Sequence, residues 1–336
     1  MSKRTGTPFD RDMATVLRRP GPAVGSLIAG IVIGLTGGAA LAGGGDEPPA
    51  TPVPVASAPS EEQPEATPSA TEAPEMKPAP EKKKTKPKAQ AGIAGAIAAV
   101  DDFVGGRNIG VAILPLGAGK PETAGLTRDF VGWSTLKVPV IAAFLQNSQP
   151  TSADLAAIER SIVQSDNEAV RSLYKKLLGD PPDVPGAEQK LQATLRLGGA
   201  QVEGMPQQTD PTIDNSVAFG TASWNAAEAA MFFHALACGR VLDDASLMLG
   251  HMKNVQGQGA FGAVDVFANV ASKGGWNGDV VNQIAIVGGD EDGFVLAVMT
   301  ESTDFSTGAG LVRQVAQRVK ASLGDPGGDP AAPSGC

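Results

Sequence analysis

The stretch Trp133-Ser134-Thr135-Leu136-Lys137-Val138-Pro139-Val140 decides how the rest of the chain is interpreted. On a helix, Ser134 and Lys137 are three residues apart and project from the same face. A lysine amine within reach of a serine hydroxyl can take its proton and leave a nucleophile at neutral pH. Ser172 and Lys175 show the same S-x-x-K spacing. The spacing alone is therefore weak, and the partners that the chain supplies to Ser134 decide its meaning.

Composition excludes several classes of protein. The chain of 336 residues has a net charge of −9, which argues against a nucleic-acid partner. Cys238 and Cys336 are too few for a disulfide framework or a cysteine-rich zinc site. His234 and His251 lack the spacing of metal ligands. We predict neither a metal nor a cofactor.

An uncharged apolar run covers residues 23–42. Its length of about 20 residues is enough to span a bilayer as a helix. Basic residues precede the run and acidic residues follow it, so residues 1–22 are predicted to be cytoplasmic and the bulk of the protein extracytoplasmic. We favour an uncleaved membrane anchor. Alternatively, Ala40-Leu41-Ala42 resembles a signal-peptidase site, and cleavage near Ala42 would release the protein.

The composition changes again on both sides of the predicted folded domain. Residues 43–90 are rich in Pro, Ala, Glu and Lys and hold almost no large apolar residue, so they cannot bury enough surface to offset their ordering entropy. We predict a disordered, extended linker there. The folded domain is predicted to cover residues 91–324. The tail, residues 325–336, is predicted to be disordered.

Hydrophobic periodicity within residues 91–324 predicts both helices and strands. The strands are expected at 108–116, 124–131, 270–273, 281–287 and 293–300. The helices are expected at 93–104, 135–146, 153–163, 168–178, 187–197, 225–237, 245–254 and 307–323. Two strands, a helical block, three strands and a helix predict an α+β fold, with a five-stranded antiparallel sheet flanked by helices.

Two further motifs could supply partners to Ser134. Ser165-Asp166-Asn167 lies between two helical patterns, where Ser165 offers a proton shuttle and Asn167 a two-sided amide. Asp166 could instead simply cap the following helix. The run Lys273-Gly274-Gly275-Trp276 continues a short apolar strand. Its lysine can attract a carboxylate, and its glycines let a substrate backbone approach the strand edge.

The order of these motifs, S-x-x-K, then S-D-N, then Lys-Gly-Gly on a strand, resembles the serine β-lactamase and penicillin-binding protein superfamily, class A in particular. The resemblance runs from about Ile109 to Leu323. The second S-x-x-K match, at Ser172, follows the S-D-N motif and is out of order. The resemblance implies a β-lactamase/transpeptidase-like fold.

The resemblance also implies roles for three catalytic residues. Ser134 would be the acyl-forming nucleophile, and Lys137 would accept its proton. Ser165 would relay a proton to the leaving nitrogen. The backbone N–H groups of Ser134 and Trp276 would form the oxyanion hole, which contributes several kcal/mol in acyl transfer.

Substrate-binding roles follow in the same way for Asn167 and for the strand motif. Asn167 would hold a substrate carbonyl or amide. Lys273 would orient the substrate carboxylate and polarise Ser165. The family has a Thr or Ser where this chain has Gly274, so one hydrogen bond to that carboxylate would be lost, at a cost on the order of 1–3 kcal/mol. Gly275 and Trp276 complete the motif.

Two other departures from class A affect the cleft and the deacylation step. The interval from Ser134 to Ser165 is much shorter than in class A, which predicts a reduced helical insert and a more open cleft. Class A enzymes activate the deacylating water with a glutamate in an E-x-x-L-N loop, and the equivalent position here falls near Gln207 and Gln208. Neither glutamine can accept a proton from water. Glu203 is nearby but lies in a sequence unlike the motif.

These features predict a serine hydrolase or penicillin-binding domain that forms an acyl-enzyme at Ser134 and releases it slowly. Its ligand would be a β-lactam or a peptidoglycan-related peptide. Two alternatives stay open. One is a true β-lactamase, which the missing glutamate disfavours. The other is a catalytically silent domain that acts as a cell-wall binding or interaction module, which Gly274 and the two glutamines favour. The sequence makes no prediction of oligomeric state.

Overall fold

The computed structural model describes residues 88–117, 119–200 and 222–336, all of them in the compact unit Ala79–Cys336. Along the chain, a block of helices lies between an early group of strands and a late group of strands. The elements are α1 (Lys88–Val104), β1 (Ile109–Pro115), β2 (Glu122–Gly125), β3 (Phe130–Val131), the 3-10 helix η1 (Trp133–Leu136), α2 (Lys137–Asn147), α3 (Ser152–Val163), α4 (Asn167–Leu178), α5 (Val184–Leu197), β4 (Ser223–Trp224), α6 (Ala226–Ala237), α7 (Ser246–Lys253), the 3-10 helices η3 (Gly257–Gly259) and η4 (Gly262–Asp265), β5 (Val270–Asn277), β6 (Val280–Val287), β7 (Phe294–Glu301) and α8 (Phe305–Leu323).

The main sheet has five strands in the order β2-β1-β7-β6-β5, and every neighbouring pair is antiparallel. Successive side chains along a strand point to opposite faces. In β1, Ile109, Val111 and Ile113 enter one hydrophobic core, whereas Ala112 and Leu114 enter the other. Both faces of the sheet are therefore covered, and the predicted α+β fold with a five-stranded antiparallel sheet is confirmed.

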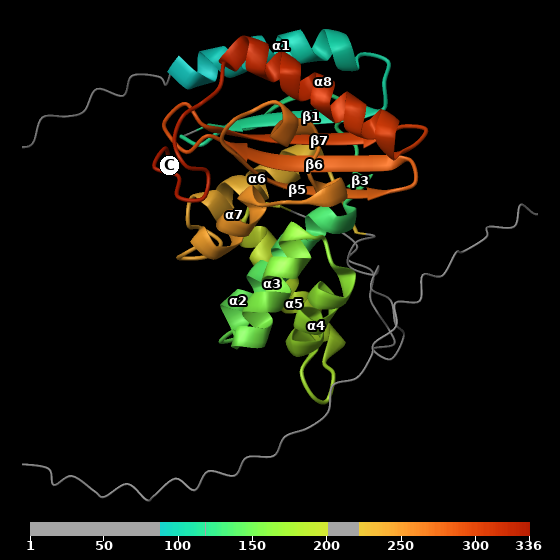
Figure 1. Ribbon diagram of the computed structural model, residues 1–336, viewed down its shortest axis with the longest axis vertical. Coiled ribbons are helices and arrows are strands. Elements are labelled where there is room, and N and C mark those ends of the chain that lie inside the picture. The colour runs from blue at the N-terminus through green and yellow to red at the C-terminus, as the bar shows by residue number, and fades with distance from the viewer. Residues whose placement is uncertain (1–87, 118, 201–221) are drawn as a thin grey trace, which may run out of the picture. The chain divides into compact units, whose positions relative to one another are not determined.

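Helices cover the two faces of the sheet in different ways (Figure 1). The terminal helices α1 and α8 contact each other and lie over one face. Val312, Val315 and Val319 of α8 are buried there, at the three- and four-residue spacing of an amphipathic helix. On the other face, α6 contacts β1 and β7, and α2 to α5 form the helical block beyond it. The nucleophile motif begins this block.

The helix expected at 135–146 differs at its start. A 3-10 turn, η1, precedes it, and the α-helix α2 begins only at Lys137. Pro139 is the third residue of α2, where its missing N–H falls in the first turn and removes no intrahelical hydrogen bond. The proline thus sets where the α-helix starts.

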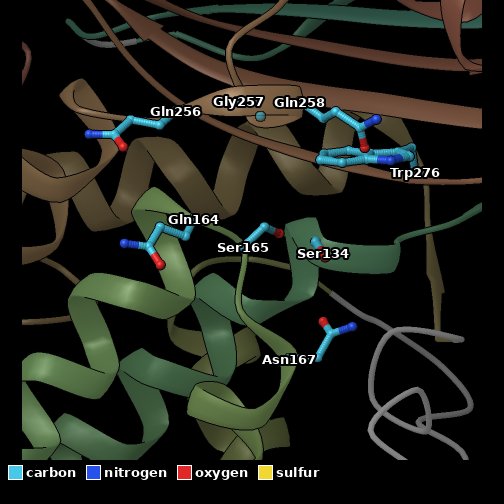
Figure 2. Close-up of a pocket in the computed structure, with 9 residues that line it drawn as sticks. Ser134, Gln164, Ser165, Asn167, Gln256, Gly257, Gln258 and Trp276 are labelled. Atoms are coloured by element: carbon cyan, nitrogen blue, oxygen red, sulfur yellow. The ribbon is translucent and has the colours of Figure 1, made fainter. Parts of the chain in front are cut away.

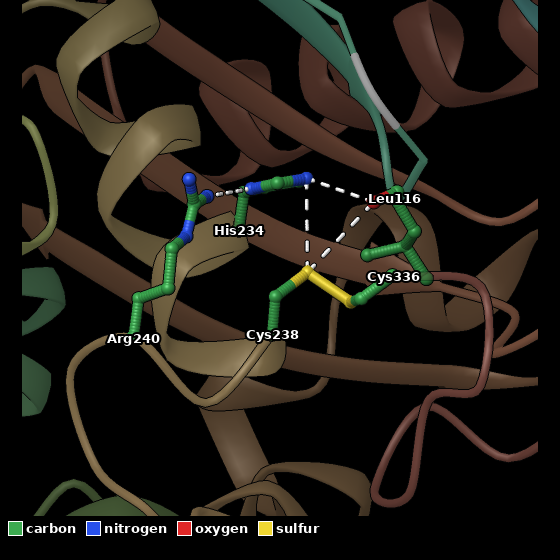
Figure 3. The surroundings of a disulfide bond; sticks show 5 residues. All are labelled: Leu116, His234, Cys238, Arg240 and Cys336. Carbon is green, nitrogen blue, oxygen red and sulfur yellow. Dashed lines mark hydrogen bonds between the residues drawn. A yellow bond between two sulfur atoms is a disulfide. The ribbon is translucent and has the colours of Figure 1, made fainter. Parts of the chain in front are cut away.

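The prediction of a disordered tail is wrong. The Gly289 N–H donates to the carbonyl of Gly327 at 2.8 Å, and the Ser334 N–H donates to the carbonyl of Gly289 at 2.7 Å. Cys238 and Cys336, too few for a framework, form a single disulfide between residues 98 positions apart (Figure 3). These bonds attach residues 325–336 to the body of the domain.

His234 lies against this disulfide (Figure 3). Its Nε2–H donates to the carbonyl of Leu116 at 3.0 Å, and the Arg240 guanidinium donates to its Nδ1. Burial lowers the pKa of His234, with the Arg240 charge acting in the same direction, so the imidazole is neutral at physiological pH. Its hydrogen bonds give it a structural role at the end of β1.

The N-terminal predictions fall outside the described residues. These are the cytoplasmic segment 1–22, the apolar run 23–42 and the linker up to residue 87. Helix α1 begins at Lys88, so it includes the last three residues assigned to the linker and starts before the expected helix at 93–104. Among the helices that the structure describes, none is long and apolar enough to cross a membrane.

Candidate active site

Ser134 lies on η1, immediately before α2. The preceding residue, Trp133, has φ 47°, and Ser165 has φ 58°. They are the two non-glycine residues with positive φ in the described part of the chain. A bulky residue in this region is strained, and such strain concentrates at functional sites. Here both strained residues flank or form the predicted site.

Strand β5 runs directly beside η1. A β-carbon on Gly275 would lie 2.7 Å from the Gly132 carbonyl oxygen, closer than any side chain can approach. Only glycine therefore allows this contact. Gly274 precedes it on the strand, and Trp276 follows it and lies above Ser134 in the cavity (Figure 2).

Lys137 is buried at the start of α2 and points toward Ser165. Its Nζ donates to the Ser165 carbonyl and, at 3.2 Å, to the Ser165 Oγ. Burial lowers the pKa of Lys137 to about 7, while the nearby Asp166 carboxylate acts in the opposite direction. A large fraction of this amine is thus neutral at physiological pH. In the part of the chain that the structure describes, no hydrogen bond joins Lys137 to Ser134.

Lys273 reaches the same serine from β5. Its Nζ donates to the Ser165 Oγ and to the Gly274 carbonyl, each at 2.9 Å. Burial lowers the pKa of Lys273 well below its usual value, and the nearby Lys137 lowers it further. The Ser165 hydroxyl accepts from both lysines, which occupies its two lone pairs and leaves its own proton free to be donated. Figure 2 shows this hydroxyl pointing toward Ser134.

Asp166 caps α4, which agrees with the simpler interpretation of the S-D-N motif. Its Oδ1 accepts from the N–H groups of Glu168 at 2.9 Å and Ala169 at 3.2 Å. Partial burial alone would raise the pKa of Asp166, but these hydrogen bonds and the Arg160 guanidinium hold it below its usual value. The cap fixes the turn that presents Ser165 and Asn167 on either side of it.

The predicted residues meet at an open cavity of about 500 Å³ (Figure 2). Ser134, Ser165, Asn167 and Trp276 line it, whereas the buried Lys137 and Lys273 are not part of its wall. Three glutamines that sequence reasoning missed complete the described lining together with two glycines: Gln164, Gln256, Gly257, Gln258 and Gly259. Gln164 could have been found from its place next to Ser165, but η3 carries no motif.

The accidental S-x-x-K match lies elsewhere. Ser172 is inside α4, where its hydroxyl donates to the Ala169 carbonyl at 2.7 Å. Neither Ser172 nor Lys175 is among the residues that line the cavity.

The residues predicted at and near the deacylation position are not among those that the structure describes. Glu203, Gln207 and Gln208 lie outside the described residues. Within residues 88–117, 119–200 and 222–336, no cluster of three or more His, Cys, Asp or Glu side chains could hold a metal ion.

Solved structures with a similar fold are β-lactamases and a penicillin-binding protein. The β-lactamase from Sphaerobacter thermophilus has a TM-score of 0.50 and 20% identity over 70% of this chain and 97% of its own. The β-lactamase from Streptosporangium roseum has a TM-score of 0.51 and 18% identity over 70% of this chain and 99% of its own. An acyl-enzyme complex of a PBP-A mutant with penicillin G has a TM-score of 0.51 and 18% identity over 69% of this chain and 97% of its own. At this identity the likeness concerns the fold.

A comparison with curated proteins gives no match. The model of the Beta-lactamase2 family, described as the beta-lactamase enzyme family, matches residues 150–323. This range holds Ser165, Asn167 and Lys273, whereas Ser134 and Lys137 precede it. It spans 174 of the 336 residues. The chain therefore belongs to the beta-lactamase enzyme family, within the serine β-lactamase and penicillin-binding protein superfamily.

Proposed function

We propose that this protein is a serine hydrolase that forms an acyl-enzyme at Ser134 and releases it slowly. Its substrate would be a β-lactam or a peptidoglycan-related peptide. The observation that carries the proposal is the position of the Ser165 hydroxyl, which accepts hydrogen bonds from Lys137 and Lys273 beside Ser134 in one open cavity. Such convergence of a nucleophile, a base and a proton donor has a direct chemical use.

The acylation step follows from these positions. The Ser134 Oγ attacks the substrate carbonyl carbon, and its proton passes to neutral Lys137. Negative charge develops on the carbonyl oxygen, which the backbone N–H groups of Ser134 and Trp276 would receive as an oxyanion hole. The carbon–nitrogen bond then breaks, and the leaving nitrogen takes the Ser165 proton. Lys137, which donates to the Ser165 Oγ, passes on to Ser165 the proton that it took from Ser134, so both side chains return to their starting state. The product is an ester on Ser134.

Release of that ester needs an activated water molecule. The segment that would supply the base holds Gln207 and Gln208 at the equivalent positions. A glutamine amide does not accept a proton from water at neutral pH. Two acidic residues lie near them in sequence, Asp210 two positions after Gln208 and Glu203 four positions before Gln207, and neither stands at the glutamine positions. The acyl-enzyme should therefore accumulate.

We place the domain outside the cytoplasm. The apolar run 23–42, with basic residues before it and acidic residues after it, supports an anchored protein whose domain is translocated. The Cys238–Cys336 disulfide adds support, because such bonds persist in oxidising compartments. Release after cleavage near Ala42 is the alternative. Membrane fractionation of cells, with protease added to intact spheroplasts, tests both: digestion of a membrane-bound domain is expected, and a protected domain would contradict the assignment.

A binding module without catalysis is the second candidate. The absence of a hydrogen bond between Lys137 and Ser134 in the described residues favours it, because the base is not yet in contact with its nucleophile. In that case peptidoglycan fragments should bind to the protein and to a Ser134→Ala variant with equal affinity, without covalent labelling of either.

Intact-mass spectrometry after incubation with penicillin G separates the two candidates. A mass increase equal to one penicillin is expected, with the label mapped to the peptide that contains Ser134. Ser134→Ala should abolish it. Ser172→Ala is the matched control, because Ser172 belongs to the same pattern but lies inside α4. Labelling of the Ser134→Ala variant would refute the proposed nucleophile.

A further inference from the structure

The wall of the cavity carries no exposed cation in the described part of the chain. Its lining holds serines, glutamines, glycines, Asn167 and Trp276, but no Lys, Arg or His. Lys137 and Lys273 are each only 1% exposed, and both donate to Ser165 rather than into the cavity. The segment 201–221 contains no Lys or Arg in its sequence. A substrate carboxylate would therefore find no free positive partner among these residues.

Gly274 has no room for a hydroxyl-bearing side chain. A β-carbon there would lie 2.6 Å from Phe261 Cε1 and 3.1 Å from Phe261 Cζ. The Phe261 ring is buried and stands edge-on to Trp276, with ring centroids 6.1 Å apart and planes at 89°. It also contacts Phe305 in the same manner, at 5.5 Å and 78°. An aromatic cluster thus occupies the space in which a Thr or Ser would receive a carboxylate.

Neutral amides surround the opening of the cavity instead. Gln164, Gln256, Gln258 and Asn167 all line it and all are exposed (Figure 2). Each primary amide offers two donors and an acceptor, which matches the N–H and C=O groups of a peptide. These side chains favour a ligand with several amides over a ligand with a charge.

The cleft continues past Gln258 toward α8. A second cavity of about 390 Å³ shares Gly257 and Gln258 with the first and is lined further on by Phe261 and Phe305. Its basic residue, Arg313, is held by Asp265, with hydrogen bonds of 2.9 Å from Nε and 2.6 Å from Nη2. The charge of Arg313 is therefore already compensated, and the extended cleft suits a longer neutral chain.

Building on the proposed acylation of Ser134, we propose that the substrate of this site is an uncharged, amide-rich acyl compound, such as an internal or amidated peptide. A free carboxylate next to the bond that Ser134 attacks, as penicillin G carries, would slow acylation without preventing it. Burial also lowers the pKa values of Lys137 and Lys273, which reduces the positive charge that the site presents to an anion.

Two thioesters that differ only in charge test this on the full-length chain. N-phenylacetyl-glycyl-thioglycolate carries a free carboxylate, and its methyl ester does not. The rate of acylation of Ser134, followed by intact mass, should be about tenfold higher for the methyl ester. An equal or higher rate for the free acid would overturn the inference.

A binding measurement tests the ligand class independently of the proposed acylation of Ser134. The Ser134→Ala chain is titrated by calorimetry with N-acetyl-D-alanyl-D-alanine and with its C-terminal amide. We expect tighter binding of the amide. If neither thioester labels Ser134 while the amide still binds better, the proposed acylation fails and the ligand class stands. Equal affinities, or no binding of either peptide at millimolar concentrations, would overturn the ligand class.

Gln258 provides a matched pair of variants, because its exposed side chain lies beside Trp276 and changes there should not affect folding. Gln258→Lys adds the missing cation and should shift the preference toward the free acid by about threefold, the size of an exposed charge pair. Gln258→Glu should shift it the other way. Identical ratios in both variants would contradict the placement of the substrate in this cleft.

Discussion

A β-carbon on Gly275 would lie 2.8 Å from the backbone nitrogen of Ser134. The strand that carries Trp276 is thus in direct contact with the turn that carries the nucleophile, and both proposed oxyanion donors depend on this contact. The strand and the turn can stay together only while position 275 lacks a side chain.

Gly275→Ala should push η1 away from β5. A misplacement of about 1 Å can cost about 100-fold in rate, so labelling of Ser134 should fall by at least that factor. Overpacking should also lower the free energy of unfolding by about 1–3 kcal/mol, measurable by urea denaturation. Gly250→Ala is the control, because a β-carbon there meets nothing within 4 Å. Unchanged labelling in Gly275→Ala would show that the contact is dispensable.

The rate of acylation should rise with pH up to about 7 and then level off. Burial lowers the pKa of Lys137 from 10.5 to about 7, and only the neutral amine can accept the Ser134 proton. Below that pH the neutral fraction falls about tenfold per pH unit, and so should the rate. Stopped-flow acylation across pH 5–9 measures the profile. Lys137→Ala should abolish the rise, whereas Lys175→Ala on the exposed face of α4 should leave it intact.

Asp166→Asn should move the midpoint of this profile to lower pH. The Asp166 carboxylate raises the pKa of Lys137, so removal of its negative charge lowers that pKa further. Asparagine is as good a helix cap as aspartate, so α4 should keep its start. The buried Lys273 also faces Ser165, and its charge acts on Lys137 in both proteins alike. A midpoint that moved upward would contradict the assignment of the profile to Lys137.

The contact of Phe261 with position 274 can be tested by a double-mutant cycle. Gly274→Thr places a β-carbon 2.6 Å from Phe261 Cε1 and should lower the free energy of unfolding by about 1–3 kcal/mol. Phe261→Leu removes the atoms that clash. The double variant should be more stable than the sum of the single effects predicts, by at least 0.5 kcal/mol, the lower end of coupling between residues in contact. Additive effects would show that the ring does not limit this position.

Replacing both Cys238 and Cys336 with serine should destabilise the domain without affecting the site. A disulfide that closes a long loop contributes about 2–4 kcal/mol, and this one joins residues 98 positions apart. Chemical denaturation measures the loss. Penicillin labelling of Ser134 at low temperature should be retained, because the bridge lies at the end of β1, away from the cavity lining. Loss of labelling in a folded variant would show that the tail supports the site.

Where chemistry and order coincide, the sequence predicted which side chains lie together, and the catalytic roles assigned to them stay predictions. Ser134, Ser165 and Trp276 belong to motifs whose order along the chain matches a known superfamily, and all three line one cavity. The strands β1, β5, β6 and β7 were predicted because their apolar runs are short and bounded by turns, whereas the strand expected at 124–131 is divided into β2 and β3, which belong to different sheets. The start of α2 was placed too early, because the effect of Pro139 on a preceding 3-10 turn is not visible in a helical pattern.

What the sequence did not predict depends on contacts between distant elements. Phe261 meets Gly274 because η4 folds back onto β5, and nothing in either local sequence indicates it. The glutamines of η3 reach the cavity for the same reason. The tail contains Pro and Gly and has no apolar pattern, so its order comes from the Cys336 bridge and from backbone hydrogen bonds with Gly289. An even pair of cysteines in a chain predicted to be extracytoplasmic was the signal that could have indicated that bridge.

The central claim is that Ser134 forms an acyl bond faster than the protein can break it. A time course of intact mass after a single addition of penicillin G, followed by removal of free penicillin, tests this most directly. We predict one adduct per chain on Ser134 that persists for hours after removal, and none on Ser134→Ala. Rapid loss of the adduct with turnover of penicillin would contradict slow release, and no adduct at any time would contradict acylation itself.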